Sequence, residues 1–195
     1  MSGNDSTLAP SDPKPGLDSK VLIVVGIALL AGISVWFLTG CNRDGKDVAM
    51  PGGTLSDARI VPVDELSGLS EETGHEVFWA GERPDTEIEV SDDPSQNVHL
   101  RYLTGGSAAG TAEQTFLDIG TYPFSNAFQT TKELSKQSSL NEVPVDGGVG
   151  FYDKKNPFSV IMAFSDQPDL QIEVYHPEKN GALDVVRSGD IVPVP

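Results

Sequence analysis

Cysteine is almost absent from this sequence, because Cys41 is the only one among 195 residues. A single cysteine cannot close an intramolecular disulfide, so a folded domain in this chain must be stabilised by packing alone. The lack of further cysteines also excludes the cysteine-rich class of zinc sites. The chain after Cys41 has no cysteine at all, and such a domain is compatible with an oxidising compartment.

Basic residues are also scarce, with 13 Lys and Arg against 29 Asp and Glu and a net charge of −16 at pH 7. Residues 42–195 hold 11 of the basic and 26 of the acidic residues, so −15 of this charge lies there. An acidic surface repels phosphate backbones and anionic lipid headgroups. Nucleic acid is therefore excluded as a partner, and the expected partner presents a neutral or basic surface.

Charge is missing entirely from Val21–Gly40, a continuous run of 20 mostly apolar residues. A helix of that length rises about 30 Å, the thickness of the hydrocarbon core of a bilayer. The run therefore predicts a membrane anchor. Residues 1–20 are polar and rich in Ser, Asp and Pro, which predicts a disordered tail. Residues 41–57 are polar and glycine-rich, as expected for a flexible tether.

The end of the apolar run, Leu38-Thr39-Gly40-Cys41, resembles the lipobox of bacterial lipoprotein signals. The resemblance implies cleavage before Cys41 and transfer of a lipid to its thiol. The run is longer than the 7 to 15 residues usual for a signal core, however, and the preceding tail is only weakly basic. Two forms of anchor stay open: a retained transmembrane helix, or a removed signal with a lipidated Cys41.

Lys20 borders the apolar run directly, and together with the N-terminal amine it favours a cytoplasmic position for the tail. The expected location is therefore the cell membrane, single-pass or lipid-anchored, with the C-terminal domain outside the cytoplasm.

Residues 58–195 carry the alternating and helical patterns of one folded domain. Asp64 is a candidate helix N-cap, and Gly74 is a candidate left-handed stop. The turn-rich residues 91–97 predict a hairpin between the strands on either side. The expected helices are 64–73, 126–138 and 182–187, and the expected strands are 76–80, 86–90, 98–103, 116–122, 149–152, 158–164 and 170–175.

This order of elements predicts an α+β fold, with a mostly antiparallel sheet of six or seven strands and two or three helices on one side. Because polar and apolar residues alternate along several strands, the other side of the sheet is expected to face water. The residues expected in the core include Phe116, Phe128, Ile161 and Phe164.

Four strand-and-turn phrases, His75–Gly81, Val98–Leu103, Phe116–Pro123 and Ile172–Pro177, resemble uncharacterised single-span or lipoprotein-like envelope proteins of actinobacteria. The resemblance covers about residues 60–195. It implies the anchored architecture and a place in the cell envelope, and it carries over no catalytic residue because those proteins have no assigned activity.

The histidines and the paired aspartates of the sequence are not spaced as metal ligands are. The three histidines, His75, His99 and His176, lie far apart along the chain and could form a zinc site only if folding brought them together. The pairs Asp92 with Asp93 and Asp166 with Asp169 lack the spaced carboxylates of a calcium loop and are typical of turns. No metal and no cofactor is therefore predicted.

A glycine-rich run and one tryptophan are two further candidate sites. The glycine-rich run 105–110 contains Ser107 but lacks both the Gly-Lys-Ser/Thr of a phosphate loop and the second Gly of a nucleophile elbow, which indicates a mobile loop. Trp79 could form an exposed platform for a glycan, although a tryptophan in such a strand more often closes a core.

The sequence therefore favours a non-enzymatic envelope module that binds or scaffolds another envelope protein or a cell-wall component, and it assigns no catalytic residue. The alternative is a small envelope hydrolase that uses paired carboxylates such as Glu87, Glu89 or Asp118. That chemistry requires two carboxyl groups in one pocket with separated pKa values, which spacing along a sequence cannot reveal.

Overall fold

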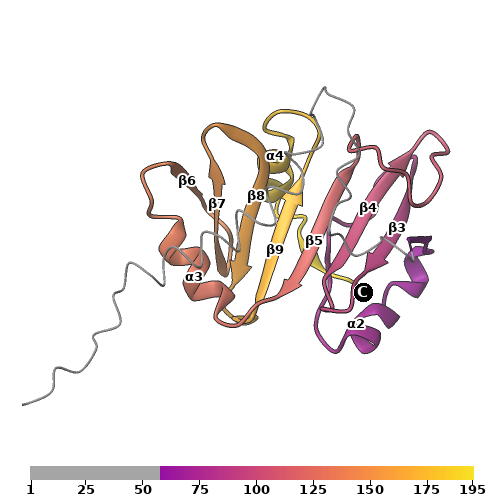
Figure 1. Cartoon of the computed structure of the whole chain (residues 1–195), viewed down its shortest axis with the longest axis horizontal. Coiled ribbons are helices and arrows are strands. Elements are labelled where there is room, and N and C mark those ends of the chain that lie inside the picture. Colours follow the sequence, from indigo (N-terminus) through magenta and orange to yellow (C-terminus); the bar gives the residue numbers. More distant parts are fainter. Residues whose placement is uncertain (1–57) are drawn as a thin grey trace, which may run out of the picture. The chain divides into compact units, whose positions relative to one another are not determined.

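The computed structural model describes residues 58–195, which form an α+β domain around an eight-stranded sheet (Figure 1). Every neighbouring pair of strands in the sheet is antiparallel, and the strand order is β1-β3-β4-β5-β9-β8-β7-β6. The strands are β1 (Arg59–Ile60), β3 (Thr86–Asp92), β4 (Val98–Thr104), β5 (Leu117–Pro123), β6 (Leu140–Val143), β7 (Gly148–Asp153), β8 (Asn156–Phe164) and β9 (Leu170–Tyr175).

A second, two-stranded sheet pairs β2 (Phe78–Trp79) with β10 (Val192–Pro193), and so joins the start of the domain to its C-terminal end. The helical segments are a 3-10 turn, η1 (Val63–Glu65), and the helices α2 (Gly68–Thr73), α3 (Ala127–Leu134) and α4 (Gly181–Ser188).

The hairpin between β3 and β4 forms as its turn residues predict. One Asp93 carboxylate oxygen accepts hydrogen bonds from the backbone N–H of Ser95, at 2.8 Å, and of Asn97, at 3.1 Å. The other oxygen accepts one from the Asn97 side chain at 2.9 Å. The carboxylate thus organises a tight turn, as Asp commonly does. Asp92 bonds to Arg59 instead, so the two neighbouring acids serve the fold separately.

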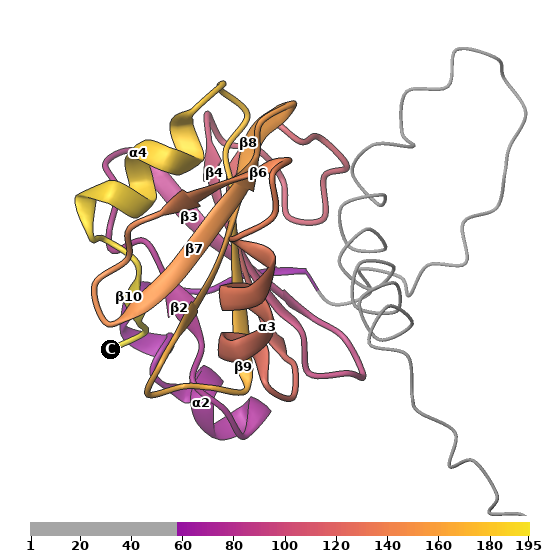
Figure 2. The same ribbon diagram turned by 90° about the vertical axis from the view of Figure 1, so that its left-hand side faces the viewer.

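Helices lie on both faces of the main sheet, which corrects the expectation that they would share one face. Figure 2 shows α4, α2 and the β2–β10 pair on one side and α3 on the other. The side that α4 covers is the main hydrophobic core, where Leu100, Ile119, Ile172 and Val174 are inaccessible to solvent. The first five residues of β9 are all buried, and they point alternately to the two faces of the sheet. Both faces of β9 must therefore be packed against other parts of the chain.

Most predicted elements are confirmed, with shifted ends. Gly74 ends α2 and Gly189 ends α4, each in the left-handed conformation with φ of 75° and 76°. The predicted helix over 64–73 starts later, at Gly68, and Asp64 lies in the separate turn η1 and caps nothing. The strand expected over 76–80 has only two residues, whereas β1 and β6 were not predicted, so the sheet has eight strands instead of six or seven.

The predicted core residues are buried to different degrees. Phe116 is buried, while Phe128, Ile161 and Phe164 are half-buried. Phe164 nevertheless stacks on Phe78 of β2, with ring centroids 5.2 Å apart, and so packs against the main core.

The predicted tail, apolar run and tether, and with them Val21–Gly40 and Cys41, lie outside the described residues. Within residues 58–195, none of the helices has the length and hydropathy needed to cross a bilayer.

Candidate functional site

The strand register brings ionisable residues together on the face of the sheet that carries α3. Glu89 of β3 lies opposite Arg101 of β4, and Arg101 lies opposite Asp118 of β5. In the adjacent row His99 lies opposite Gly120, which lies opposite Glu173 of β9. Because alternate residues of a strand point to the same face, these side chains form one continuous polar patch.

This polar face is buried, contrary to the expectation that it would be in contact with water. Helix α3 packs over β7, β8 and β9, and the 105–116 segment bonds to residues of β3, β4 and β9. Glu89 retains 1% of its exposed surface and Glu173 retains 3%. Charged groups so buried must be paired or must change protonation state, because transfer of an isolated charge from water is very costly.

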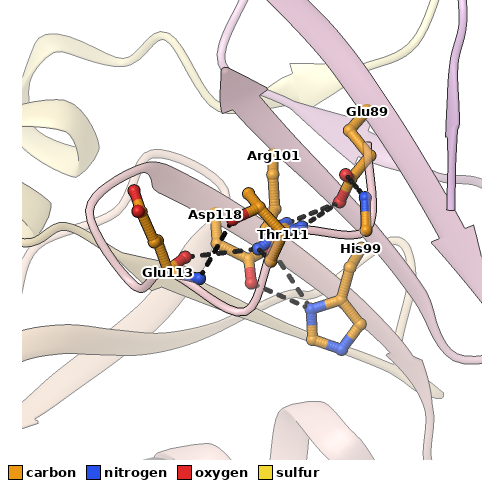
Figure 3. A network of polar contacts seen from close by, with 7 residues as sticks. Glu89, His99, Arg101, Thr111, Glu113 and Asp118 are labelled. Carbon is orange, nitrogen blue, oxygen red and sulfur yellow. Dashed lines mark hydrogen bonds and ion pairs between the residues drawn. The ribbon is translucent and has the colours of Figure 1, made fainter. Parts of the chain in front are cut away.

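Glu89 and Arg101 form an ion pair that fastens the 105–116 segment to the sheet (Figure 3). Arg101 Nε donates to Glu89 Oε1 at 2.6 Å, and its Nη2 lies 2.5 Å from the same oxygen. Glu89 Oε2 accepts a hydrogen bond from the Gly110 N–H at 2.6 Å. Arg101 Nη1 donates to the carbonyl oxygens of Thr111, at 2.9 Å, and Glu113, at 3.4 Å. Both charges are therefore used in holding this segment.

The segment is held at its end by two more contacts. The Tyr175 hydroxyl donates to the Gln114 carbonyl at 3.0 Å, and the Phe116 ring lies 5.9 Å from the Arg101 guanidinium carbon. Apart from Phe116, residues 105–116 bury no side chain, so polar contacts supply nearly all of their attachment.

His99 is paired with Asp118 at the centre of the polar face. Its Nδ1 lies 3.1 Å and 3.2 Å from the two Asp118 oxygens, and its Nε2 lies 3.4 Å from the Tyr122 hydroxyl. Burial by itself would lower the pKa of His99, but the carboxylates of Asp118, Glu173 and Asp93 outweigh it and leave the pKa raised. The neighbouring carboxylates therefore stabilise the imidazolium form of His99.

Glu173 and Tyr122 complete the cluster. Burial is the main cause that raises the pKa of the Glu173 carboxyl, with the hydroxyls of Ser159 and Tyr122 as its hydrogen-bonding neighbours. Burial likewise raises the pKa of Tyr122 well above its usual range. The Glu173 carboxyl, which holds its proton more tightly than an exposed glutamate does, therefore belongs to the same cluster as His99 and Asp118.

Gly120 makes this arrangement possible. A Cβ at this position would overlap the ring and hydroxyl of Tyr122, two residues further along β5. The missing side chain lets the Tyr122 ring lie across its own strand, edge-on to His99 with ring centroids 5.5 Å apart. No periodicity in the sequence signalled this contact, because it depends on the orientation of one side chain.

Three buried polar atoms near α3 have no hydrogen-bond partner among the described residues: Glu173 Oε2, Gln171 Nε2 and Thr131 Oγ1. Gln171 and Glu173 are alternate residues of β9 on the α3 side of the sheet, and Thr131 is a buried residue of α3. Buried polar atoms are normally satisfied, so this end of the polar face has unused hydrogen-bonding capacity.

The three histidines do not converge. His75 bridges the carbonyl oxygens of Glu76 and Gln96, at 2.7 Å and 2.8 Å. His176 accepts a hydrogen bond from the Glu178 N–H at 3.0 Å, beside Gly181. Across residues 58–195, no three His, Cys, Asp or Glu side chains are grouped as a metal ion would require.

The other candidates have structural roles. Ser107 donates to the Thr104 carbonyl at 2.7 Å, within its own turn. Trp79 is buried in the main core, so the interpretation as a core residue is confirmed. Asp169 accepts a hydrogen bond from the Asn126 N–H at 2.7 Å, just before α3. Asp166 is exposed.

Of the three carboxylates considered for a hydrolase, Glu89 and Asp118 lie on the polar face and Glu87 is exposed. Sequence reasoning missed the partners that decide their chemistry, namely Arg101, His99 and Glu173. The alternation of polar residues along β3, β4 and β5 was the available signal, and it was interpreted as a face in contact with water.

These features define an α+β domain with a buried network of charged groups on one face of an antiparallel sheet. Comparison of the chain with family models, with curated proteins and with solved structures gave no significant match.

Proposed function

We propose that the protein is a membrane-anchored, extracytoplasmic binding module that holds a basic component of the cell envelope and does not turn it over. The observation that carries this proposal is the uneven distribution of charge over the domain. Residues 58–118 contain 13 acidic and 3 basic residues, a net charge of −10, whereas residues 119–195 contain 10 and 6, a net charge of −4.

The basic residues of the first half are all used within the fold. Arg59 pairs with Glu72 and Asp92, Arg83 pairs with Asp190, and Arg101 pairs with Glu89. The exposed acids Glu65, Glu71, Glu82, Asp85 and Glu87 then face solvent with no basic residue of residues 58–118 left to neutralise them. A surface of this kind attracts a partner rich in lysine or arginine.

The anchor supports the envelope location. The uncharged run Val21–Gly40 is long enough to span a bilayer, and Cys41 follows it in a lipobox-like setting. Protease added to intact cells stripped of their wall is expected to remove the domain. Labelling with a fatty-acid analogue distinguishes the two anchors, because label that is lost in Cys41→Ser indicates lipidation. Full protection from protease contradicts the outward orientation.

Two of the three carboxylates expected for a hydrolase are unsuited to acid–base chemistry. Glu89 is neutralised by Arg101, and Glu87 points to solvent, so neither offers a free acid or base in a shared pocket. The remaining carboxyls, Asp118 and Glu173, contact His99 and Tyr122 on a buried face.

The test is cross-linking in intact cells, followed by recovery of the full-length protein at increasing salt. A variant with Glu65→Gln, Glu71→Gln and Glu87→Gln is expected to recover several-fold less of a specific envelope component than the wild type. The matched control, Glu142→Gln, Asp166→Asn and Glu178→Gln, removes the same charge from residues 119–195 and is expected to retain recovery.

Equal losses in both variants would show that only total charge matters, and would contradict a localised binding surface. Enrichment no greater than that of the anchor alone, together with hydrolysis of an ester, peptide or glycoside by the purified protein, would support the enzyme alternative instead.

A further inference from the structure

The polar face concentrates acidic groups around one histidine. Asp118 on β5, Glu173 on β9 and Asp93 in the β3–β4 turn all act electrostatically on His99. Arg101, the other cation on this face, is already bound by Glu89. Among residues 58–195, His99 is therefore the cation of this face that remains available to the three acidic groups. The charged or titratable groups that face it are Asp93, Asp118, Tyr122 and Glu173, with the Glu89–Arg101 pair in the neighbouring row.

A second observation points to a ligand at the same place. Glu173 Oε2 has no hydrogen-bond partner among the described residues, although the residue is 97% buried. Gln171 Nε2, two residues earlier on β9, is also without a partner. An unsatisfied buried acceptor is costly, and a hydrogen-bond donor placed against Glu173 removes that cost.

His99 is more exposed than its partner Asp118. Its side chain is 24% exposed, while that of Asp118 is 10% exposed. Within the described residues, Asp118 contacts the ring at Nδ1 and Tyr122 contacts it at Nε2. Rotation of the imidazole away from Asp118 therefore breaks these contacts without moving a strand.

We propose that Asp118 and Glu173 form a receptor for one organic cation, the ammonium of a lysine or the guanidinium of an arginine, and that the His99 imidazolium occupies this place until the partner supplies it. The inference rests on the proposed function, because it assigns a specific acceptor to the basic partner. An organic cation fits better than a metal ion, since within residues 58–195 no three ligating side chains are grouped for a metal.

Proton release follows from this exchange. His99, displaced from its carboxylates, loses the interactions that keep it protonated, and Glu173 ionises beside the incoming cation. Protons on both groups therefore compete with the ligand. The affinity for a cation should rise with pH, whereas attraction to the exposed acidic surface alone changes little between pH 6 and pH 8, where Asp and Glu are already ionised.

The experiment uses the full-length protein in non-ionic detergent micelles and a ten-residue lysine peptide as the probe. Isothermal titration in phosphate and in Tris, which differ in ionisation enthalpy, counts the protons released on binding. The wild type is expected to release protons and to bind about tenfold more tightly at pH 8 than at pH 6. The NMR signal of the His99 ring, assigned by its absence in His99→Gln, should move towards that of neutral, solvated imidazole.

Three variants isolate the site. Glu173→Gln keeps the shape of the side chain and is expected to lose most of the proton release and of the rise in affinity with pH. His99→Gln should bind more tightly at pH 6 than the wild type does at the same pH. Glu142 is an exposed carboxyl that lies outside the acidic residues 58–118 and outside the His99 cluster, so Glu142→Gln should leave proton release unchanged. Circular dichroism of each variant verifies that it is folded.

Peptide binding that is salt-dependent but releases no protons, with Glu173→Gln equal to Glu142→Gln and an unshifted His99 signal, overturns this inference and leaves the proposed function standing. Absence of peptide binding at low salt overturns both. The count of protons released by the wild type decides the matter even where a variant fails to fold.

Discussion

Glu89 and Arg101 lie directly opposite each other on β3 and β4, and their ion pair is the point at which the 105–116 segment joins the sheet. One strand register thus fixes both the neutralisation of a buried carboxylate and the position of a 12-residue segment that has little apolar contact of its own.

Replacement of Arg101 by Met should strongly destabilise the protein, because it leaves the Glu89 carboxylate buried without its cation. The expected loss is about 3–5 kcal/mol in the free energy of unfolding, measured by urea denaturation. Hydrogen exchange of residues 105–116 should also become faster. The double replacement Glu89→Leu with Arg101→Met is expected to recover part of the loss.

Arg59→Met is the matched control, since Arg59 makes its two ion pairs at an exposed position and such pairs contribute about 0–1 kcal/mol. A loss for Arg101→Met no larger than this control would contradict a structural role for the buried pair.

Gly120→Ala should destabilise the protein because the new methyl group overlaps the Tyr122 ring. Overpacking of this kind costs about 1–3 kcal/mol, which corresponds to a fall in Tm of several degrees. Tyr122→Leu in the same chain should remove part of the cost, so the two changes are not additive.

Gly68→Ala is the comparison, since a methyl group at Gly68 meets no atom within 4 Å and the residue begins α2. It should be neutral or stabilising by up to about 1 kcal/mol. Equal effects at the two glycines would show that Tyr122 does not depend on Gly120.

Stability should fall as pH rises through the range set by His99 and Glu173. Both groups have a pKa that is raised in the folded protein, so each binds its proton more tightly in the folded state than in the unfolded chain. The contribution of His99 is complete below its ordinary pKa of about 6.5 and is lost as pH rises through its raised value. The contribution of Glu173 is complete below its ordinary pKa of about 4.3 and is lost as pH rises through its raised value.

Melting curves at intervals between pH 4.5 and pH 9 measure this dependence. His99→Gln should flatten the upper part of the profile, and Glu173→Gln should flatten the part that begins at lower pH. The carboxyl-to-amide change Glu142→Gln controls for the general effect of net charge. If the wild type and the three variants have the same profile, the stability does not depend on the titration of His99 and Glu173.

A fragment beginning at Leu55 should fold and be indifferent to reductant and to EDTA. It contains no cysteine, and its apolar core, with Leu100, Ile119 and Ile172, supplies the burial that stabilises a domain of this size. Circular dichroism and thermal melting with and without EDTA provide the measurement. A fall in Tm of many degrees with the chelator would revive a metal site.

The elements that the sequence predicted best are those with local signals. Strands β3, β4 and β9 were found because polar and apolar residues alternate along them, and their hairpin was found because Asp93 and its neighbours can close a turn by themselves. Strands β1 and β6 were missed because two or four residues give no detectable period.

The side of each helix was decided by packing that no local pattern records. Helix α3 has an apolar stripe, which predicts burial but does not say on which face of the sheet. The structure places α3 and α4 on opposite sides because β8 and β9 have buried side chains on both.

The sequence by itself determined the composition of the domain, its lack of disulfides, its excess of acid and most of its strands, because these depend on residue identity or on contacts between near neighbours. Tertiary structure alone decided which charges meet. Glu89, Arg101, His99, Asp118 and Glu173 come from four strands, and only their register makes them partners. Burial then raises the pKa of Glu173, and the carboxylates around His99 raise its pKa in spite of burial, because the protonation of a group depends on the atoms around it in space and not on its neighbours along the chain.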